Sequence, residues 1–424
     1  MSELSYLEKL LDGAEVEWLP LGVLGELVRG NGLPKTDFTE AGIPAIHYGQ
    51  IYTFYGLSTE TTKSFVSQDT AKKLKKVNTG DVVITNTSEN LDDVGKALVY
   101  LGKEQAVTGG HATIFKPREG IIGKYFAYFT QTNSFYNEKR KYSKGTKVID
   151  VSASDMAKII IPIPCPNNPE KSLAIQSEIV RILDKFTALT AELTAELTAE
   201  LNMRKKQYNY YLDQSLSFKE GEVELKTLGE MGTLIRGKRF VKSDIIPKGV
   251  PCIHYGEMYT HYRIWADKAK SYISVELASK LRKASCGDVV FVSAGETIAD
   301  IGRGTAWLGD EDVVIHDACF FYKSSLNPKY VAYFSRTNFF HDQIKKSISS
   351  GKISAINAKG FEKVIIPVPS PEEQARIVAF LDKFDTLTNS ITEGLPREIE
   401  LRQKQYEYYR DLLFSFPKPE TVSN

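Results

Sequence analysis

The chain has 424 residues, a formal net charge of +1 and an apolar fraction of 42%. It is too long for one ordinary core and suits two or three domains. A strong non-specific polyanion binder is usually more basic, so any nucleic-acid contact must come from local patches. No apolar run approaches the ~20 residues of a membrane span, and the scattered cysteines, without a C-x-x-C pair, argue against a zinc site or a disulfide framework. We therefore expect a cytoplasmic protein.

The first part of the chain predicts a short helix and a globular domain. Leucines recur at helical spacing within residues 1–15, which indicates an amphipathic helix without a signal-peptide core. Residues 16–170 then mix short β-branched runs, such as Val82–Thr85, with Gly-rich punctuation and brief helical patterns, which predicts a domain of the α/β (α+β) class. The Ile161–Pro164 stretch closes this domain, because its prolines exclude both a central strand and a helix.

A long helix is predicted over residues 171–218, where strong helix formers run on without Gly or Pro. Its centre holds three Thr-Ala-Glu-Leu tetrads: Thr190–Leu193, Thr194–Leu197 and Thr198–Leu201. Leucine at every fourth position keeps one apolar stripe that drifts around a helix of 3.6 residues per turn. A repeat of about one helical turn suits a helix that acts as a ruler, because it sets the distance between two objects. A surface helix with chance low complexity is the alternative interpretation.

The second half of the chain repeats the first. Gly42–Thr53 recurs as Gly249–Thr260, at an offset of 249 − 42 = 207, and Ile179–Phe186 recurs as Ile377–Phe384. Matches this long and this collinear indicate a tandem duplication of a domain followed by a helix.

The duplication predicts how the rest of the chain is organised. We expect a second domain over residues 219–370, a second helix over 371–416 and a tail over 417–424. Gly394 and Pro396 should interrupt the second helix.

Two equivalent helices in one chain can pair through their apolar stripes. Duplicated units tend to pair about a pseudo-two-fold axis, so we expect antiparallel helices with one domain at each end, a dumbbell with a coiled-coil spacer of about 45 Å. The side chains expected on these spacer and partner helices are Leu189, Leu193, Leu197, Leu201, Leu381 and Phe384.

The usual signatures of an enzyme do not occur in the sequence. There is no G-x-x-x-x-G-K-[ST] loop, no H-E-x-x-H and no G-x-S-x-G, and the six histidines have no close metal-ligand spacing. We therefore expect no catalytic residue, no metal and no cofactor.

Three loops that recur in both halves are candidates for DNA contact. Each His-Tyr pair follows an apolar strand and precedes a glycine, so it could present a stackable side chain to bases; a structural turn kept through duplication is the alternative. A second loop follows the Val82–Thr85 run. A third clusters cations around a flexible glycine, which suits phosphates, although a charged run can be a solvated face. The candidates are His47, Tyr48, Asn86, Thr87, Lys139, Arg140, Lys141, Lys144 and Lys147 in the first half, and His254, Tyr255, Ser293, Lys345, Lys346 and Lys352 in the second.

Two divergent domains, each closed by Ile-Pro-[Ile/Val]-Pro and followed by a helix with Ile-Val-x-x-Leu-Asp-Lys-Phe, resemble the specificity subunits of type I restriction–modification systems. The likeness covers essentially the whole chain, including the Gly-Asp-Val-Val runs at Gly80 and Gly287. The resemblance implies a non-catalytic DNA reader in which each target-recognition domain recognises half of a split target. It also implies helices that dock two methyltransferase subunits, which in turn recruit restriction subunits.

Two other functions compete with this interpretation. One is a two-headed scaffold whose helices join protein-binding modules, for which salt dependence of DNA binding discriminates. The other is a self-sufficient DNA methyltransferase, which the missing cofactor and target-base motifs already disfavour.

Overall fold

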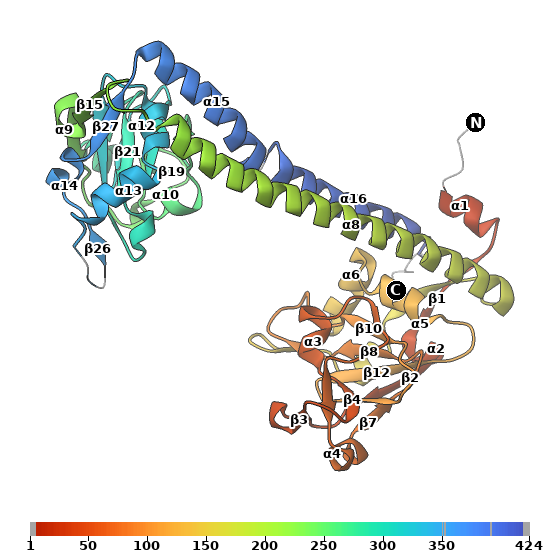
Figure 1. Ribbon diagram of the computed structural model, residues 1–424. Coiled ribbons are helices and arrows are strands. Elements are labelled where there is room, and N and C mark those ends of the chain that lie inside the picture. Colours follow the sequence, from red (N-terminus) through yellow and green to blue (C-terminus); the bar gives the residue numbers. More distant parts are fainter. Residues whose placement is uncertain (1–5, 350, 352, 391, 419–424) are drawn as a thin grey trace. The chain divides into compact units, whose positions relative to one another are not determined.

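The computed structural model describes residues 6–349, 351, 353–390 and 392–418 (Figure 1). The chain divides into two compact units. Unit 1 comprises Met1–Ala195 with Glu400–Asn424, and unit 2 comprises Glu196–Ile399. Each unit therefore combines one globular domain with segments of two helices that are far apart in the sequence.

The domain of unit 1 is built from short strands and short helices, as the α/β (α+β) prediction requires. In chain order its elements are α1 (Tyr6–Leu11), β1 (Val16–Pro20), α2 (Leu21–Leu24), β2 (Gly25–Arg29), β3 (Phe38–Thr39), β4 (Ile43–Ile46), α3 (Tyr48–Thr53), β5 (Ser58–Thr59), β6 (Ser64–Val66), α4 (Gln68–Lys73), β7 (Lys75–Val77), β8 (Val82–Thr85), β9 (Thr87–Ser88), β10 (Ala97–Tyr100), β11 (Ala106–Thr108), β12 (Ala112–Pro117), α5 (Gly123–Phe129), α6 (Asn133–Tyr142), β13 (Ile149–Asp150), α7 (Ala153–Met156) and β14 (Ile160–Pro164).

Two five-stranded sheets organise this domain. Their strand orders are β2-β12-β8-β10-β5 and β3-β6-β4-β11-β7. Neighbouring strands are antiparallel except that β5 runs parallel to β10 and β4 runs parallel to β11. Two further pairs, β1 with β14 and β9 with β13, complete the domain.

Without counterparts of α1 and β3, the domain of unit 2 repeats this order of elements. They are β15 (Glu224–Thr227), α9 (Leu228–Met231), β16 (Gly232–Arg236), β17 (Val250–Ile253), α10 (Glu257–Thr260), β18 (Trp265–Ala266), β19 (Ser271–Ile273), α11 (Val275–Ala278), β20 (Lys283–Ala284), β21 (Val289–Val292), β22 (Ala294–Gly295), β23 (Gly304–Trp307), β24 (Val313–Ile315), β25 (Cys319–Ser324), α12 (Pro328–Phe334), α13 (Asn338–Lys345), β26 (Ser354–Ala355), α14 (Ala358–Glu362) and β27 (Ile365–Val368). Its sheets have the orders β16-β25-β21-β23-β18 and β19-β17-β24-β20, with the pairs β15-β27 and β22-β26.

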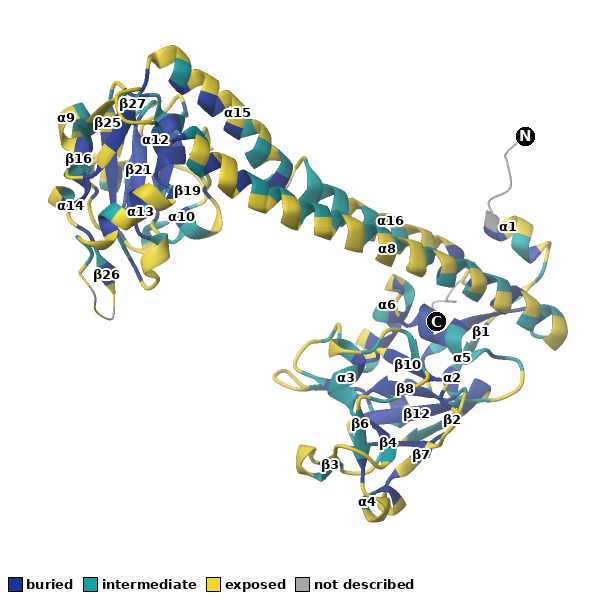
Figure 2. Cartoon of the chain, viewed as in Figure 1, coloured by how far each residue is buried: buried dark blue, intermediate teal, exposed yellow. Residues whose placement is uncertain are grey.

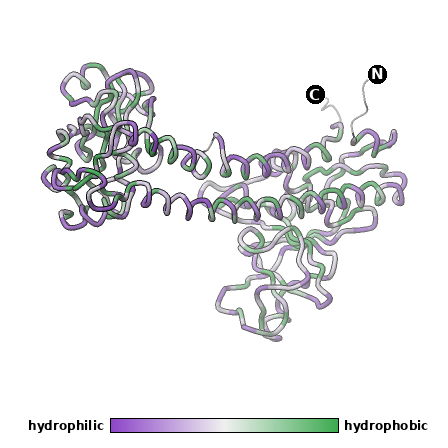
Figure 3. Tube along the Cα trace, turned by 45° about the horizontal axis from the view of Figure 1, so that its top comes forward, coloured by the Kyte–Doolittle hydropathy of each residue, from purple (hydrophilic) through white to green (hydrophobic). Residues whose placement is uncertain are grey.

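The run Val82–Thr85 singled out in the sequence is the central strand β8, its counterpart in unit 2 is β21, and every residue in both strands is buried. Successive side chains of a strand point to opposite faces of the sheet. Val82 and Ile84 accordingly enter the large core of unit 1, while Val83 enters a second core with Ile46 and Ala106. A sheet covered on both faces explains why these strands are continuously apolar. Figure 2 shows the central strands coloured as buried, and Figure 3 colours the chain by hydropathy.

The Ile-Pro-Ile-Pro and Ile-Pro-Val-Pro stretches form neither a central strand nor a helix, as predicted, and each lies in a two-stranded pair. Strand β14 pairs only with β1, and β27 pairs only with β15. Proline lacks an N–H for a second neighbour, so these strands close each domain without continuing its sheet.

The first long helix, α8, spans Pro169–Ser215, against the predicted 171–218. The second helical region consists of α15 (Pro371–Asn389) and α16 (Leu395–Leu413), against the predicted 371–416. The interruption at Gly394 is confirmed, and its φ of +80° is a conformation that favours glycine. Pro396 lies in the first turn of α16, where its missing N–H costs no hydrogen bond.

Each domain is fastened to its own long helix by the same polar contacts. In unit 1, the Lys124 ammonium and the Tyr128 hydroxyl both donate to the Asp184 carboxylate, at 2.8 and 2.7 Å. In unit 2, Lys329 and Tyr333 donate to Asp382 at the same two distances. Recurrence of the whole arrangement shows that the duplication preserved the joint between domain and helix.

A helix segment from elsewhere in the chain completes each unit. In unit 1, α16 packs antiparallel to the first half of α8, with Tyr406 beside Thr187 and Asp411 accepting from the Asn133 amide at 2.8 Å. In unit 2, the end of α8 packs antiparallel to α15, and Asp213 accepts from Asn338 at 2.8 Å. Antiparallel helix pairing is therefore present within each unit.

The apolar stripe of the tetrads is only partly covered. Leu381 is buried and Phe384 packs against the core of unit 2, whereas Leu193, Leu197 and Leu201 are half-buried. Leu189 is 50% exposed, which corrects its expected place in the helix pair. The physical reason is the drift of a four-residue period around a 3.6-residue helix.

Candidate nucleic-acid interface

The two His-Tyr-Gly tips begin short helices, and their histidines are structural caps. His47 Nδ1 accepts from the Gly49 N–H at 3.2 Å, and Gln50 Oε1 accepts from the His47 N–H at 3.5 Å. In unit 2, His254 Nδ1 accepts from Gly256 and Glu257 accepts from His254. The side chain of His254 is buried in the domain, so it offers nothing at the surface. These contacts favour the structural interpretation of the two histidines.

Burial lowers the pKa of these imidazoles. Desolvation is the largest cause for both His47 and His254, followed for His47 by the charge of Lys35. A lowered pKa favours the neutral ring, which the capping bond requires because only the unprotonated Nδ1 can accept.

The tyrosine that follows each capping histidine packs against a second histidine. The Tyr48 and His111 ring centroids are 4.8 Å apart, and those of Tyr255 and His316 are 5.1 Å apart. The two second histidines are not equivalent in sequence, because His111 directly precedes β12 whereas His316 lies three residues before β25. Each unit thus builds a Tyr–His ring pair from a different loop position. Sequence comparison at a fixed offset missed both second histidines.

An arginine and a glycine hold the loop of the second histidine. Arg29 Nε donates to the Gly110 carbonyl at 3.0 Å, and its equivalent Arg236 donates to the Asp317 carbonyl at 2.8 Å. A Cβ on the next residue, Gly30, would lie 2.1 Å from the Gly109 carbonyl oxygen. The recurrence of Leu-[Val/Ile]-Arg-Gly at residues 27–30 and 234–237 is the sequence signal that could have found this support.

The second predicted loop joins this site from the end of β8. The Asn86 N–H donates to the His111 carbonyl, and the Thr87 hydroxyl lies 2.8 Å from His111 Nδ1. In unit 2, the Ser293 N–H donates to the Ala318 carbonyl. The Asn86 and Ser293 side chains are buried, which corrects their expected role as surface donors. Neither polar atom of the Asn86 amide has a hydrogen-bond partner among the described residues.

The third predicted loop is a hairpin that attaches to the second. Strand β13 pairs with β9 in unit 1, and β26 pairs with β22 in unit 2. The Val151 N–H donates to the Asn86 carbonyl, as Ile356 does to Ser293. The structure therefore brings together three loops that the sequence could only propose one at a time.

The predicted cations of the third loop differ in availability. Arg140, Lys141, Lys144, Lys147, Lys345 and Lys346 are exposed, and Lys352 lies outside the described residues. Lys141 pairs with Glu138, Lys144 with Asp155, and Lys345 with Asp342. The lysine side of each pair is exposed, so an anion in solvent can reach these ammonium groups.

Lys139 is enclosed. Its side chain is buried, and its ammonium donates to the carbonyls of Val94 and Asp92. Burial lowers the pKa of Lys139 to about 8, with the charge of Asp92 opposing that shift. The side chain supports the loop at residues 92–95 from within, which corrects its expected role as a phosphate ligand.

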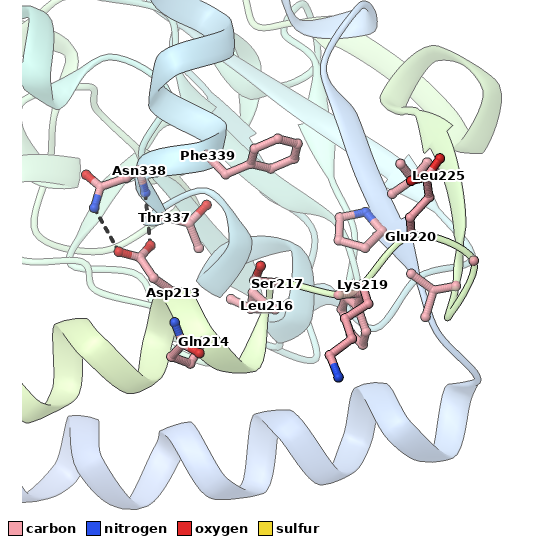
Figure 4. A pocket seen from close by; sticks show the side chains of 14 residues that line it. Asp213, Gln214, Leu216, Ser217, Lys219, Glu220, Leu225, Thr337, Asn338 and Phe339 are labelled. Carbon is pink, nitrogen blue, oxygen red and sulfur yellow. Dashed lines mark hydrogen bonds between the residues drawn. The ribbon is translucent and has the colours of Figure 1, made fainter.

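Unit 2 also contains a cavity of about 620 Å³, where the chain leaves α8 for β15 (Figure 4). Figure 4 shows Asp213 hydrogen-bonded to Asn338 beside it. The cavity is lined by Leu225, which is 62% exposed. Its equivalent in unit 1 is Trp18, which is 8% exposed and whose indole N–H donates to the Pro417 carbonyl. None of the predicted DNA candidates lines this cavity.

In the part of the chain that the structure describes, no group of three or more His, Cys, Asp or Glu side chains could hold a metal ion. No helix there has the length and apolar character needed to cross a membrane.

Comparison with known proteins places the chain in a family. The family described as "Type I restriction modification DNA specificity domain" matches residues 15–203 and again residues 220–401. The "Type I restriction enzyme EcoR124I/EcoR124II specificity subunit" of Escherichia coli is 41% identical, with 100% of both chains covered. The "Type I restriction enzyme EcoprrI specificity subunit" of the same species is 36% identical over 93% of each chain.

Solved structures share the fold. A chain from "Structural basis underlying complex assembly and conformational transition of the type I R-M system" has a TM-score of 0.66 at 17% identity and covers 94% of this chain. The HsdS subunit from Thermoanaerobacter tengcongensis has a TM-score of 0.56 at 16% identity and also covers 94%. Both matches span more than nine-tenths of those chains, at 97% and 95%. With a double match to the family and full-length relatives above 30% identity, the chain belongs to the type I restriction–modification specificity subunits.

Proposed function

We propose that this chain is the DNA-reading, non-catalytic subunit of a type I restriction–modification complex and that each unit reads one half of a split target. The observation that carries the proposal is the repeated surface: both units present a tyrosine packed on a histidine, near a hairpin and a preceding helix end with exposed cations. Two copies of one reading surface suit two half-sites better than one continuous site.

The residues of this surface divide by chemistry. Tyr48 and Tyr255 are the partly accessible aromatic side chains of their ring pairs and could meet base edges. Exposed cations on the hairpins and the preceding helices suit phosphates, which fix register without reading sequence. Divergent loops around a shared framework would then give each unit its own half-site.

The partners follow from the same proposal. Methylation and cleavage would belong to methyltransferase and restriction subunits, so this chain itself would need no cofactor. Two methyltransferase subunits would dock along the helices, where Tyr210 and Tyr408 occupy equivalent positions and are 60% and 64% exposed. Large exposed aromatic side chains are enriched at protein interfaces.

A methylation map tests the function. The chain is co-expressed with the methyltransferase subunit of its own system in a host without DNA methylation, and modified adenines are located. A single split motif with a fixed unread gap supports the proposal and supplies both half-sites. A stable complex that adds no methylation contradicts it and favours a two-headed scaffold.

Salt dependence provides an independent measure. Each phosphate contact contributes a slope of about −0.9 to the plot of log affinity against log salt concentration. Binding through several exposed cations of both units therefore predicts a steep slope, whereas a protein scaffold predicts no specific binding to any duplex.

A further inference from the structure

Each unit carries one exposed branched aliphatic side chain at the same point of its third loop. Val148 is 54% exposed and Ile353 is 63% exposed. The two residues are equivalent, because the offset of 353 − 148 = 205 also relates Lys124 to Lys329. Single exposed apolar side chains are common on protein surfaces. Recurrence at one position of two divergent loops is a stronger observation.

The loop that carries Val148 has a defined shape. Lys144 and Asp150 exchange backbone hydrogen bonds of 3.0 and 2.8 Å, and their equivalents Ser349 and Ala355 do the same at 2.9 and 3.1 Å. Gly145 has a φ of +98°, and a Cβ there would lie 2.0 Å from the Val148 carbonyl oxygen. The turn thus depends on glycine and holds Val148 outward on a closed hairpin.

The base of the hairpin belongs to the candidate interface. Ile149 pairs with Ser88, and Asp150 pairs with Thr87, whose hydroxyl contacts His111 in the ring pair with Tyr48. In unit 2 the pairing of β26 with β22 gives the same attachment. Both exposed aliphatic residues therefore project from the framework that also holds the Tyr–His ring pair.

The surroundings of Val148 favour nucleic acid as its partner. Lys144 and Lys147, on the same hairpin, are exposed, as is Arg140 at the end of α6. Cations around an apolar tip suit a duplex, because the phosphates meet the cations while the tip enters a groove. Binding to a protein partner would instead desolvate these charges.

We propose that Val148 and Ile353 make direct apolar contacts with the bases of the two half-sites, one in each. The inference rests on the proposed DNA-reading function and deepens it by naming a base-reading residue in each unit. The contact is with a thymine methyl group or with an opened base step, which share the same apolar chemistry.

The first test compares Val148→Thr with Lys147→Gln in the full chain, assembled with its methyltransferase subunit. The probe is a duplex that carries the mapped target. Threonine keeps the shape and strand preference of valine but adds a hydroxyl. We expect Val148→Thr to lower affinity by at least about fivefold at every salt concentration, with an unchanged salt slope. Lys147→Gln should instead make the salt slope shallower by the contribution of about one phosphate contact.

Val23→Thr is the matched control, because Val23 is 58% exposed on α2 and belongs to none of the three loops. It should bind as the wild type does. A duplex with a scrambled first half-site should remove the difference between Val148→Thr and wild type. Ile353→Thr should show the same behaviour toward the second half-site.

Replacing each thymine of the target by uracil separates the two forms of contact. If the wild type loses affinity for one uracil-substituted duplex and Val148→Thr does not, the contact is with the methyl group of that thymine. If Val148→Thr binds every uracil-substituted duplex more weakly than the wild type does, the contact is with an opened base step.

Equal affinities of wild type, Val148→Thr and Ile353→Thr across the salt series would overturn the inference while leaving the DNA-reading function intact. A changed salt slope in Val148→Thr would overturn it too, since the residue would then act on phosphate contacts. Absence of specific binding by the wild type would refute the function itself, and the inference with it.

Discussion

The Phe186 ring stacks on the Tyr409 ring, with centroids 5.5 Å apart and planes inclined by 18°. Phe186 belongs to α8 and Tyr409 to α16, so the end of the chain completes unit 1. In unit 2 the equivalent rings, Phe384 and Tyr211, have centroids 5.3 Å apart. Each domain is therefore closed by a helix end that follows the other domain in the sequence.

Removal of this stack should weaken unit 1. We expect Phe186→Ala to lower the free energy of unfolding by roughly 1–3 kcal/mol, because a half-buried aromatic ring and its stacked partner are lost. Thermal or urea unfolding measures the change. Leu189→Ala, three residues along the same helix at a 50% exposed position, should change stability by only a few tenths of a kcal/mol. A similar loss in both variants would contradict the assigned contact.

Deletion of Thr194–Leu197 should shorten the unread gap of the target by one base pair. One tetrad contributes about 6 Å and about 400°, a net twist of about 40°. One base-pair step contributes ~3.4 Å and roughly 35°. Twist thus matches one base pair, although the rise exceeds it. A methylation map of the variant measures the gap, and altered bases in either half-site would refute the ruler role of the tetrads.

Gly30→Ala should disturb the first unit's reading surface. Its Cβ would lie 2.1 Å from the Gly109 carbonyl oxygen, in the loop that carries His111. We expect a loss of about 1–3 kcal/mol in stability and weaker binding to the first half-site. Gly32→Ala, where nothing lies within 4 Å of the added carbon, is the control and should behave as wild type. Wild-type binding by Gly30→Ala would show that the loop position is unimportant.

Acid should destabilise unit 2 through its histidine pair. The rings of His254 and His316 lie 4.7 Å apart, and desolvation lowers the pKa of both below the ordinary 6.5. Glu257 and Asp317 oppose these shifts, whereas Lys242 and Arg239 reinforce them. Below that ordinary value the unfolded chain binds more protons than the folded one, so stability falls as the pH drops.

The measurement compares urea midpoints at about pH 7.5 and about pH 5.5. His254→Asn keeps an acceptor for the Gly256 N–H but cannot titrate. Its midpoint should fall less between the two pH values than that of the wild type. His316, His47 and His341, whose pKa values are also lowered, contribute to the dependence that remains. An unchanged pH dependence in His254→Asn would exclude this histidine as a source.

The sequence located the candidate loops but misjudged several of their side chains. Recurrence in both halves identified the His-Tyr tips, the loop after β8 and the lysine-rich hairpins. It could not separate Lys139, whose ammonium donates to loop carbonyls inside the domain, from exposed Lys147 on the hairpin that follows. The difference is one of packing: Lys139 lies on α6 against Gly95 and the loop at residues 92–95, whereas Lys147 lies in the exposed turn of the hairpin.

The sequence by itself determined the tandem duplication, the long helices, the break at Gly394 and the family resemblance. These features follow from local composition and from recurrence, which are written along the chain. Only the tertiary structure decided that α16 completes unit 1, that His111 and His316 reach equivalent tyrosines from different loop positions, and that Val148 and Ile353 stand exposed. Such facts depend on contacts between segments far apart in sequence, where packing and burial, rather than residue type, fix what each side chain meets.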